Sequence, residues 1–193
     1  VRSATKVDAT LIGAAPRLRV IARAGTGVDN VDLQAASARG ILVLNAPGAN
    51  SVSVAEHACA LMLALARSIS RADAGMKQGR WEKAHLVGAE LRGKTLGVVG
   101  LGRIGQEVAR RALAFGMLVL AYDPFITAQV AGDLGAELVS LDELCAQADF
   151  VTLHVPSTST TRHMFDAARF ARCKAGMQLI NTARGDLIDE PAL

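Results

Sequence analysis

The 193-residue sequence is poor in aromatic residues, which make up 4% of it, and it contains no block of lysines and arginines. Its formal net charge is only +3, and the basic residues are spread along the chain. Proteins that bind nucleic acids usually concentrate positive charge on one face or along one segment. The composition therefore argues against a nucleic-acid partner.

The sequence also lacks a long apolar run and a metal-binding pattern. Its most apolar stretch, residues 52–66, contains Glu56 and His57 and is too short to cross a bilayer. No signal-peptide pattern is visible at the N-terminus. Three cysteines are present, far apart and without metal-ligand spacing: Cys59, Cys145 and Cys173. We therefore expect no membrane partner, no bound metal and a reducing, cytoplasmic setting.

The most informative segment covers residues 95–123, TLGVVGLGRIGQEVARRALAFGMLVLAYD. Gly100, Gly102 and Gly105 form G-x-G-x-x-G directly after an apolar run, and a helical pattern follows. In such a unit the first glycine permits a tight turn, the second lets the backbone approach a pyrophosphate, and the third allows close helix–strand packing. The helix N-terminus then offers N–H groups to the phosphates. The segment predicts dinucleotide binding, with a purely structural glycine turn as the alternative.

Asp123 indicates which dinucleotide is bound. A carboxylate at the end of the second strand accepts hydrogen bonds from the adenosine ribose and repels a 2′-phosphate. No arginine or lysine follows it in residues 124–127. The position favours NAD over NADP, and the alternative is a solvated residue at a strand end.

The chain as a whole alternates predicted strands and helices, which is typical of an α/β protein with a doubly wound parallel sheet. A strand at 19–23, a helix at 31–38 and a strand at 41–44 precede a breaker cluster at 45–50. Further along, we expect residues 75–91 to be irregular and residues 165–173 to form a helix. We predict part of a substrate-binding domain over residues 1–47 and a nucleotide-binding domain over 48–193. Both chain ends look cut, so we expect an internal piece of a longer protein.

Two strand ends in the second domain carry further candidates, because ligands in open α/β sheets lie beyond the carboxyl ends of strands. The guanidinium of Arg184 suits a carboxylate and stabilises charge developing on a carbonyl oxygen. Alternatively, Arg184 is a surface residue paired with Asp186 or Asp189. His154 ends a buried strand, so we interpret it as structural or cofactor-side. In the first domain, Arg23 and its neighbouring turn are suited to an anion, although solvated charges are the alternative.

Several segments together resemble the D-isomer-specific 2-hydroxyacid dehydrogenases over essentially the whole chain. They are VRSATKV (1–7), RAGTGVDNVDL (23–33), NSVSVAEHACALMLALAR (50–67), GKTLGVVGLGRIGQEVA (93–109), AYDP (121–124) and NTARGDLIDE (181–190). The resemblance implies a Rossmann-type NAD-binding domain and part of a smaller flavodoxin-like substrate domain. It further implies NAD-dependent oxidation of 3-phosphoglycerate to 3-phosphohydroxypyruvate, the first step of serine biosynthesis. A homodimer or homotetramer, formed through the helix that begins at Ser51, is also implied.

The resemblance assigns roles to individual residues. It places the following residues at the cofactor: Thr26, Gly100, Gly102, Arg103, Ile104, Gly105, Asp123, Val155, Thr182 and Ala183. It places four residues at the anionic substrate: Arg2, Arg23, Asn50 and Arg184, of which Arg184 is the catalytic residue of this chain. The family's catalytic His and orienting Glu lie beyond the equivalent of Leu193, so we expect no appreciable turnover by these 193 residues alone.

One departure and two alternatives accompany the resemblance. Where the family usually reads A-R-G-G, Asp186 follows Gly185 here, and its carboxylate can partly offset the charge of Arg184. A related enzyme acting on glyoxylate, hydroxypyruvate, D-lactate, formate or phosphite shares the same nucleotide half. A non-catalytic, NAD(H)-sensing co-repressor would also reuse this fold.

Overall fold

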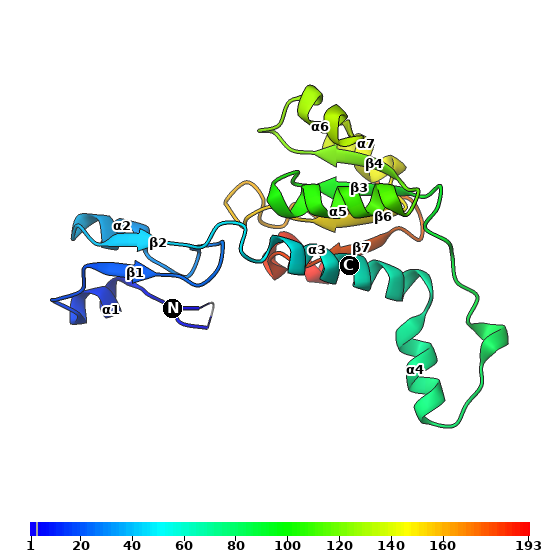
Figure 1. The fold of residues 1–193 in the computed structure, drawn as a ribbon, viewed down its shortest axis with the longest axis horizontal. Helices are drawn as coiled ribbons and strands as arrows, with labels where there is room; N and C mark the ends of the chain where they lie inside the picture. Colours follow the sequence, from blue (N-terminus) through cyan, green and yellow to red (C-terminus); the bar gives the residue numbers. More distant parts are fainter. Residues whose placement is uncertain (3) are drawn as a thin grey trace. The chain divides into compact units, whose positions relative to one another are not determined.

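The computed structural model describes residues 1–2 and 4–193, which form two compact units, Val1–Val52 and Ser53–Leu193 (Figure 1). The contacts divide the chain a few residues after the predicted boundary. The assignment of residues 1–47 to a substrate-binding domain stays a prediction.

The first unit is a small parallel α/β structure. Its elements are α1 (Ala9–Ala14), β1 (Val20–Ala22), α2 (Leu33–Ala38) and β2 (Leu42–Leu44), and the two strands pair in parallel. Asp32 begins α2, because its side chain accepts a hydrogen bond from the Ala35 N–H at 2.9 Å. The predicted strand–helix–strand order is confirmed, and α1 is an addition to it. The core consists of Val7, Ile12, Ile21, Val31, Ala36 and Ile41.

The second unit contains a five-stranded parallel sheet in the order β5-β4-β3-β6-β7. Its strands are β3 (Thr95–Val99), β4 (Leu118–Tyr122), β5 (Glu137–Leu138), β6 (Phe150–Leu153) and β7 (Gln178–Asn181). Its α-helices are α3 (Ser51–Ala66, beginning just before the unit), α4 (Ile69–Lys77), α5 (Arg103–Ala114), α6 (Ala128–Leu134), α7 (Leu141–Gln147) and α8 (Ala167–Phe170). Three short 3₁₀ helices complete it: η1 (Lys83–His85), η2 (Gly185–Leu187) and η3 (Glu190–Ala192).

Helices cover both faces of this sheet, so the doubly wound architecture is confirmed. Buried side chains of α3, α5 and α6 pack with Leu96 and Val98 on one face. Buried side chains of α7 pack with Val99 and Val151 on the other face, together with Phe165. Successive residues of β3 point to opposite faces, and both sets are buried, which explains why the strand sequence is apolar throughout.

The strand order creates one crevice of special interest. From β3 the chain winds through α5 to β4 on one side of the sheet, and it later returns to β6 on the other side. The carboxyl ends of β3 and β6 therefore lie side by side, and the connections leave them in opposite directions. Ligands of open α/β sheets bind at this switch point.

Two details differ from the sequence-based expectations. The predicted helix at 165–173 is confined to α8: it begins after Asp166, whose side chain accepts from the Arg169 N–H at 2.8 Å, and its C-cap is Ala171. Helix α4 continues to Lys77, into a region that was expected to be irregular from Gly75 onward. Among the described residues, no single helix is long and apolar enough to cross a membrane. Only α3 and α4 taken together are, and they are bent by 70° at the break between them.

Gly97 provides a test of how tightly α7 packs on the sheet. A Cβ at this position of β3 would lie 2.8 Å from Leu144 Cγ and 3.2 Å from Ala148 Cβ. We expect Gly97→Ala to lower the free energy of unfolding by about 1–2 kcal/mol, because the helix must shift to admit the methyl group. Chemical denaturation measures the change. Gly132→Ala is the matched control, since nothing lies within 4 Å of its added Cβ; it should raise stability by about 0.5–1 kcal/mol through helix propensity. Equal effects of the two substitutions would contradict the packing argument.

Candidate cofactor site

The glycine-rich turn between β3 and α5 begins with a residue that only glycine accommodates. Gly100 has a φ of 94°, in the left-handed region. Its N–H donates to the Tyr122 carbonyl at 2.8 Å, which ties the turn to the end of β4. A Cβ here would lie 2.8 Å from the His154 carbonyl oxygen and from Val155 Cγ1. The turn is therefore hydrogen-bonded to the end of β4 and packed closely against the residues that follow β6.

The other two glycines of the motif differ in their surroundings. A Cβ on Gly105 would collide with the Gly100 carbonyl oxygen, so this glycine allows α5 to start close against the turn. Around a Cβ on Gly102 nothing lies within 4 Å. Gly102 stands at the start of α5, and no side chain of the described residues caps this helix end. The N–H groups of the first turn, which includes Arg103 and Ile104, can therefore bind an anion.

Asp123 lies beside this turn, directly after β4. Its Oδ2 accepts a hydrogen bond from the Leu101 N–H at 2.8 Å, and its Oδ1 accepts one from the Phe125 N–H at 2.9 Å. Each carboxylate oxygen has a second lone pair, so the group can still accept hydrogen bonds from a ribose. The side chain of Phe125 is 92% exposed at the same strand end.

The end of β6 supplies His154 and Val155. The imidazole Nε2 of His154 lies 2.9 Å from Thr152 Oγ1, a hydroxyl that is itself buried. Burial lowers the pKa of His154 to about 4, so the ring is neutral at physiological pH. A neutral ring that is bonded within its own strand supports the structural or cofactor-side interpretation.

The end of β7 is organised by Asn181. Its Nδ2 donates to the Arg184 carbonyl at 2.8 Å, and its Oδ1 accepts from the Ala183 N–H at 2.9 Å. The Oγ1 atom of Thr182 is buried and has no hydrogen-bond partner among the described residues. Such an atom, at the carboxyl end of a strand, fits a place where a bound ligand supplies the missing partner.

Arg184 follows in this turn and precedes η2. Its Nη1 donates to the Ala183 carbonyl at 2.9 Å, which directs the guanidinium along the turn. The neighbouring Asp186, whose charge was expected to offset Arg184, accepts a hydrogen bond from Ser157 Oγ at 2.6 Å. This contact joins the loop after β6 to the loop after β7.

The remaining predicted residues belong to the first unit. Thr26 Oγ1 donates to Asn50 Oδ1 at 2.9 Å, so these two are neighbours. The Arg23 side chain lies against Gly25, where a Cβ would collide with its guanidinium. Arg2 is exposed. The roles predicted for these four residues, Thr26 at the cofactor and Arg2, Arg23 and Asn50 at the substrate, stay predictions.

Sequence reasoning missed three residues of this region. Gln106 donates from Nε2 to the Leu101 carbonyl at 3.1 Å. Asn181 shapes the turn that holds Arg184, and Phe125 exposes a ring beside Asp123. The sequence offered a signal for Asn181 alone, because asparagine after a strand and before T-A-R-G often bonds the backbone two residues on.

Comparison with known proteins places this geometry in a family context. The family described as "D-isomer specific 2-hydroxyacid dehydrogenase, NAD binding domain" matches residues 59–193. D-3-phosphoglycerate dehydrogenase of Mycobacterium tuberculosis is 53% identical over the whole chain, which spans 37% of that enzyme's length. Hydroxypyruvate reductase of Thermotoga maritima is 56% identical over the whole chain, which spans 62% of it.

The structural comparison agrees. D-lactate dehydrogenase of Aquifex aeolicus, solved in complex with NAD and lactic acid, superposes with a TM-score of 0.92 at 39% identity. The match covers 100% of this chain and 58% of that one. The family description and this neighbour confirm the Rossmann-type fold and the predicted cofactor, NAD.

His154 makes stability depend on pH. Its pKa is about 4 in the folded chain and 6.5 in the unfolded one, so between these values only the unfolded state binds the proton. The free energy of unfolding should therefore fall as the pH drops from 6.5 to 4, by about 2–3 kcal/mol at most. Denaturation at several pH values measures this slope. The His154→Gln variant should show a shallower slope over the same range; an unchanged slope would assign the pH dependence to other groups.

Proposed function

The chain belongs to the D-isomer specific 2-hydroxyacid dehydrogenases, and from this premise we propose that its protein oxidises 3-phosphoglycerate to 3-phosphohydroxypyruvate with NAD. The observation that carries the proposal is the uncapped start of α5 beside Asp123, on a chain that is 53% identical to D-3-phosphoglycerate dehydrogenases. The chain spans 37% of those relatives, so the activity concerns the whole protein.

We propose that the cofactor is held at the carboxyl ends of the strands. When bound, NAD supplies the acceptor for a hydride. The N–H groups at Gly102, Arg103 and Ile104 bind the pyrophosphate, and Asp123 accepts hydrogen bonds from the adenosine ribose. Val155, Thr182 and Ala183 line the rest of the cleft, with Thr182 Oγ1 offering an otherwise unpartnered hydroxyl.

Arg184 is the residue that we propose for the substrate carboxylate and the carbonyl oxygen that forms during oxidation. A guanidinium has five N–H donors in a planar fork, so it holds a carboxylate while also bonding Ala183. Its fixed positive charge stabilises the negative charge on the oxygen in the transition state. The Asn181 contacts and the bond between Ser157 and Asp186 restrict the turn that carries it.

A second candidate reaction is the reduction of hydroxypyruvate. It is favoured by the 56% identity to the hydroxypyruvate reductase of Thermotoga maritima. The two reactions differ at the substrate, because only 3-phosphoglycerate carries a phosphate in addition to its carboxylate. The cations that we propose for this phosphate are Arg2 and Arg23, in the unit that also carries Thr26 and Asn50.

The distinguishing experiment is a steady-state assay of the purified protein with both substrates, and with NADP(H) as a cofactor control. We expect Arg23→Ala to raise the KM for 3-phosphoglycerate about 10-fold or more, since a charge-assisted contact to phosphate is lost. The KM for hydroxypyruvate should change far less. Arg17→Ala, at an exposed arginine of the same unit, is the matched control. Turnover of hydroxypyruvate without turnover of 3-phosphoglycerate would select the second candidate.

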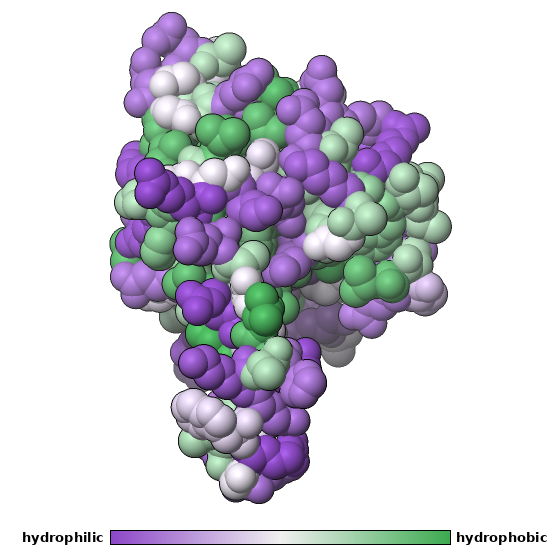
Figure 2. Space-filling view, turned by 90° about the vertical axis from the view of Figure 1, so that its right-hand side faces the viewer, coloured by the Kyte–Doolittle hydropathy of each residue, from purple (hydrophilic) through white to green (hydrophobic). Residues whose placement is uncertain are grey.

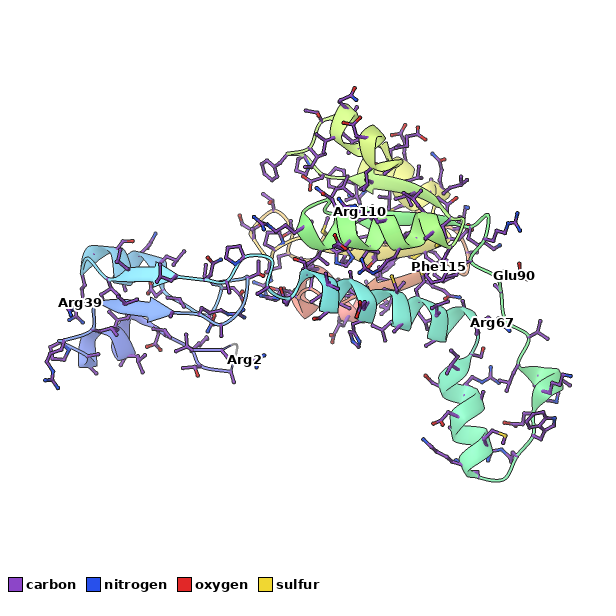
Figure 3. The ribbon with its side chains drawn as sticks, viewed as in Figure 1. Arg2, Arg39, Arg67, Glu90, Arg110 and Phe115 are labelled. Atoms are coloured by element: carbon purple, nitrogen blue, oxygen red, sulfur yellow. The ribbon has the colours of Figure 1, made fainter. Side chains whose placement is uncertain are left out.

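We further propose that the protein is a homodimer or homotetramer that associates through α3 and the segment 67–90, here called the arm. Ala89 N–H donates to the Ala66 carbonyl at 2.8 Å and closes the base of the arm, where Arg67 and Glu90 lie (Figure 3). Apolar residues lie among hydrophilic ones on the surface of this region (Figure 2). The exposed large apolar side chains of α3 and the arm are Val52, Leu61, Leu65, Ile69, Met76, Trp81 and Val87. So much exposed apolar surface on one helix and its extension is typical of an interface.

Replacing Leu65 by Asp tests this interface. The charge would be buried without a partner if a second copy covers the helix, so we expect a shift to monomers. Sedimentation or light scattering measures the mass. Val130→Asp on α6, at a side chain that is 44% exposed, serves as the control and should leave the assembly unchanged. An unchanged mass for Leu65→Asp would place the interface elsewhere.

A cytoplasmic location also stays a proposal. It is supported by the three cysteines, which are all free thiols, with Cys59 and Cys145 buried.

A further inference from the structure

Leu101, between the first two glycines of the turn, is held by side chains at both of its backbone polar groups. Its N–H donates to Asp123 Oδ2 at 2.8 Å, and its carbonyl accepts from Gln106 Nε2 at 3.1 Å. Its own side chain is fully buried, with an exposed fraction of 0%. Glycine leaves the backbone of a turn conformationally free. The two side-chain hydrogen bonds to Leu101 therefore restrict a segment that would otherwise be flexible.

The attachment extends to the neighbouring residues. Gly100 N–H donates to the Tyr122 carbonyl at 2.8 Å, so two successive N–H groups of the turn bind the end of β4. Asp123 is oriented in turn by the Phe125 N–H, which donates to its other oxygen at 2.9 Å. All of these contacts lie within the chain. They hold the turn in the shape that directs the start of α5 outward.

We propose that Asp123 and Gln106 are positioning residues for the glycine turn, and that Asp123 acts on the pyrophosphate through Leu101 as well as on the ribose directly. This inference rests on the cofactor site proposed above. Without the Asp123 carboxylate, the Leu101 N–H loses its acceptor in a buried setting, which is costly, and the turn must move. The N–H groups at Gly102 and Arg103 would then no longer converge on one anion.

A consequence concerns cofactor preference. If Asp123 acted on the ribose alone, its removal would weaken NAD binding only through the ribose hydroxyls and would relieve the repulsion of a 2′-phosphate. As a positioning residue, its removal also weakens the binding of any dinucleotide. Replacing Asp123 alone should therefore reduce NAD affinity without creating strong NADP binding.

The test compares NADH with an analogue that lacks both hydroxyls of the adenosine ribose, using calorimetry on the purified protein. The analogue removes the direct contact, so any remaining effect of Asp123 passes through the turn. We expect Asp123→Ala to bind the analogue about 10-fold more weakly than the wild type does. Asp123→Asn retains one oxygen that can accept from Leu101 N–H, so it should recover most of that loss. Asp133→Ala, at an exposed carboxylate that accepts a hydrogen bond from Gln129 within α6, is the control.

Gln106→Leu provides an independent arm, because Gln106 holds the Leu101 carbonyl and is not placed at the ribose. Gln106→Leu should weaken the binding of NADH and of the analogue by the same factor. It also replaces Asp123→Ala as the deciding variant if the latter does not fold. Amide hydrogen exchange at Leu101, in protein without cofactor, should accelerate in both variants and stay unchanged in Asp133→Ala.

The possible results distinguish a failure of the positioning role from a failure of the proposed cofactor site. Unchanged affinity for the analogue in Asp123→Ala, or in Gln106→Leu when the first variant is unfolded, overturns the positioning role. If the wild type binds neither NADH nor the analogue, the proposed cofactor site is wrong. If exchange at Leu101 is then also unchanged in the two variants, the positioning role is overturned as well. If exchange is accelerated, Asp123 and Gln106 hold the turn, although the turn does not bind the cofactor.

Discussion

The second unit depends on the close approach of three backbone segments at one point: the turn after β3, the start of α5 and the end of β6. Side chains would prevent this approach, since a Cβ on Gly100 would lie 2.8 Å from the His154 carbonyl and one on Gly105 would collide with Gly100. Because both glycines lack a Cβ, α5 starts against the sheet edge. The helix N–H groups consequently open at the switch point, where the strand order leaves a crevice.

The same crowding explains how the strand ends share their hydrogen bonds. The turn is attached to β4 through the Tyr122 carbonyl and the Asp123 carboxylate, and to α5 through Gln106. Buried N–H and carbonyl groups need partners, and in a turn without regular pairing they obtain them from side chains. Gly102 is the exception, with open space around it and no cap on the helix behind it. The N–H groups of Gly100 and Leu101 are hydrogen-bonded within the chain and hold the turn, whereas the start of α5 has no cap and is left for the proposed anion.

The charged and titratable groups at the carboxyl edge of the sheet also differ in their roles. His154 is half-buried and its ring is neutral, so the centre of the edge carries no titrating proton near physiological pH. Arg184 brings a permanent positive charge on a turn that Asn181 shapes, and Asp186 is engaged by Ser157. Fixed positive potential of this kind suits the anionic substrate and the dinucleotide that we propose for this edge.

The sequence by itself determined the fold class, the glycine turn and the cofactor type. Local chemistry suffices for these: alternating apolar strands and helices, glycine spacing, and an acid at a strand end. Only the tertiary structure decided which atoms those residues bind. From the sequence, Asp123 is predicted to accept hydrogen bonds from a ribose. In the structure it also accepts one from the Leu101 N–H, because strand pairing brings the end of β4 against a turn 22 residues earlier. The contacts of Gln106 and Phe125 are local, to residues five and two positions earlier in the chain. They become part of one arrangement only because the long-range bond between Leu101 and Asp123 joins the two segments, and side-chain spacing along the chain does not encode that bond.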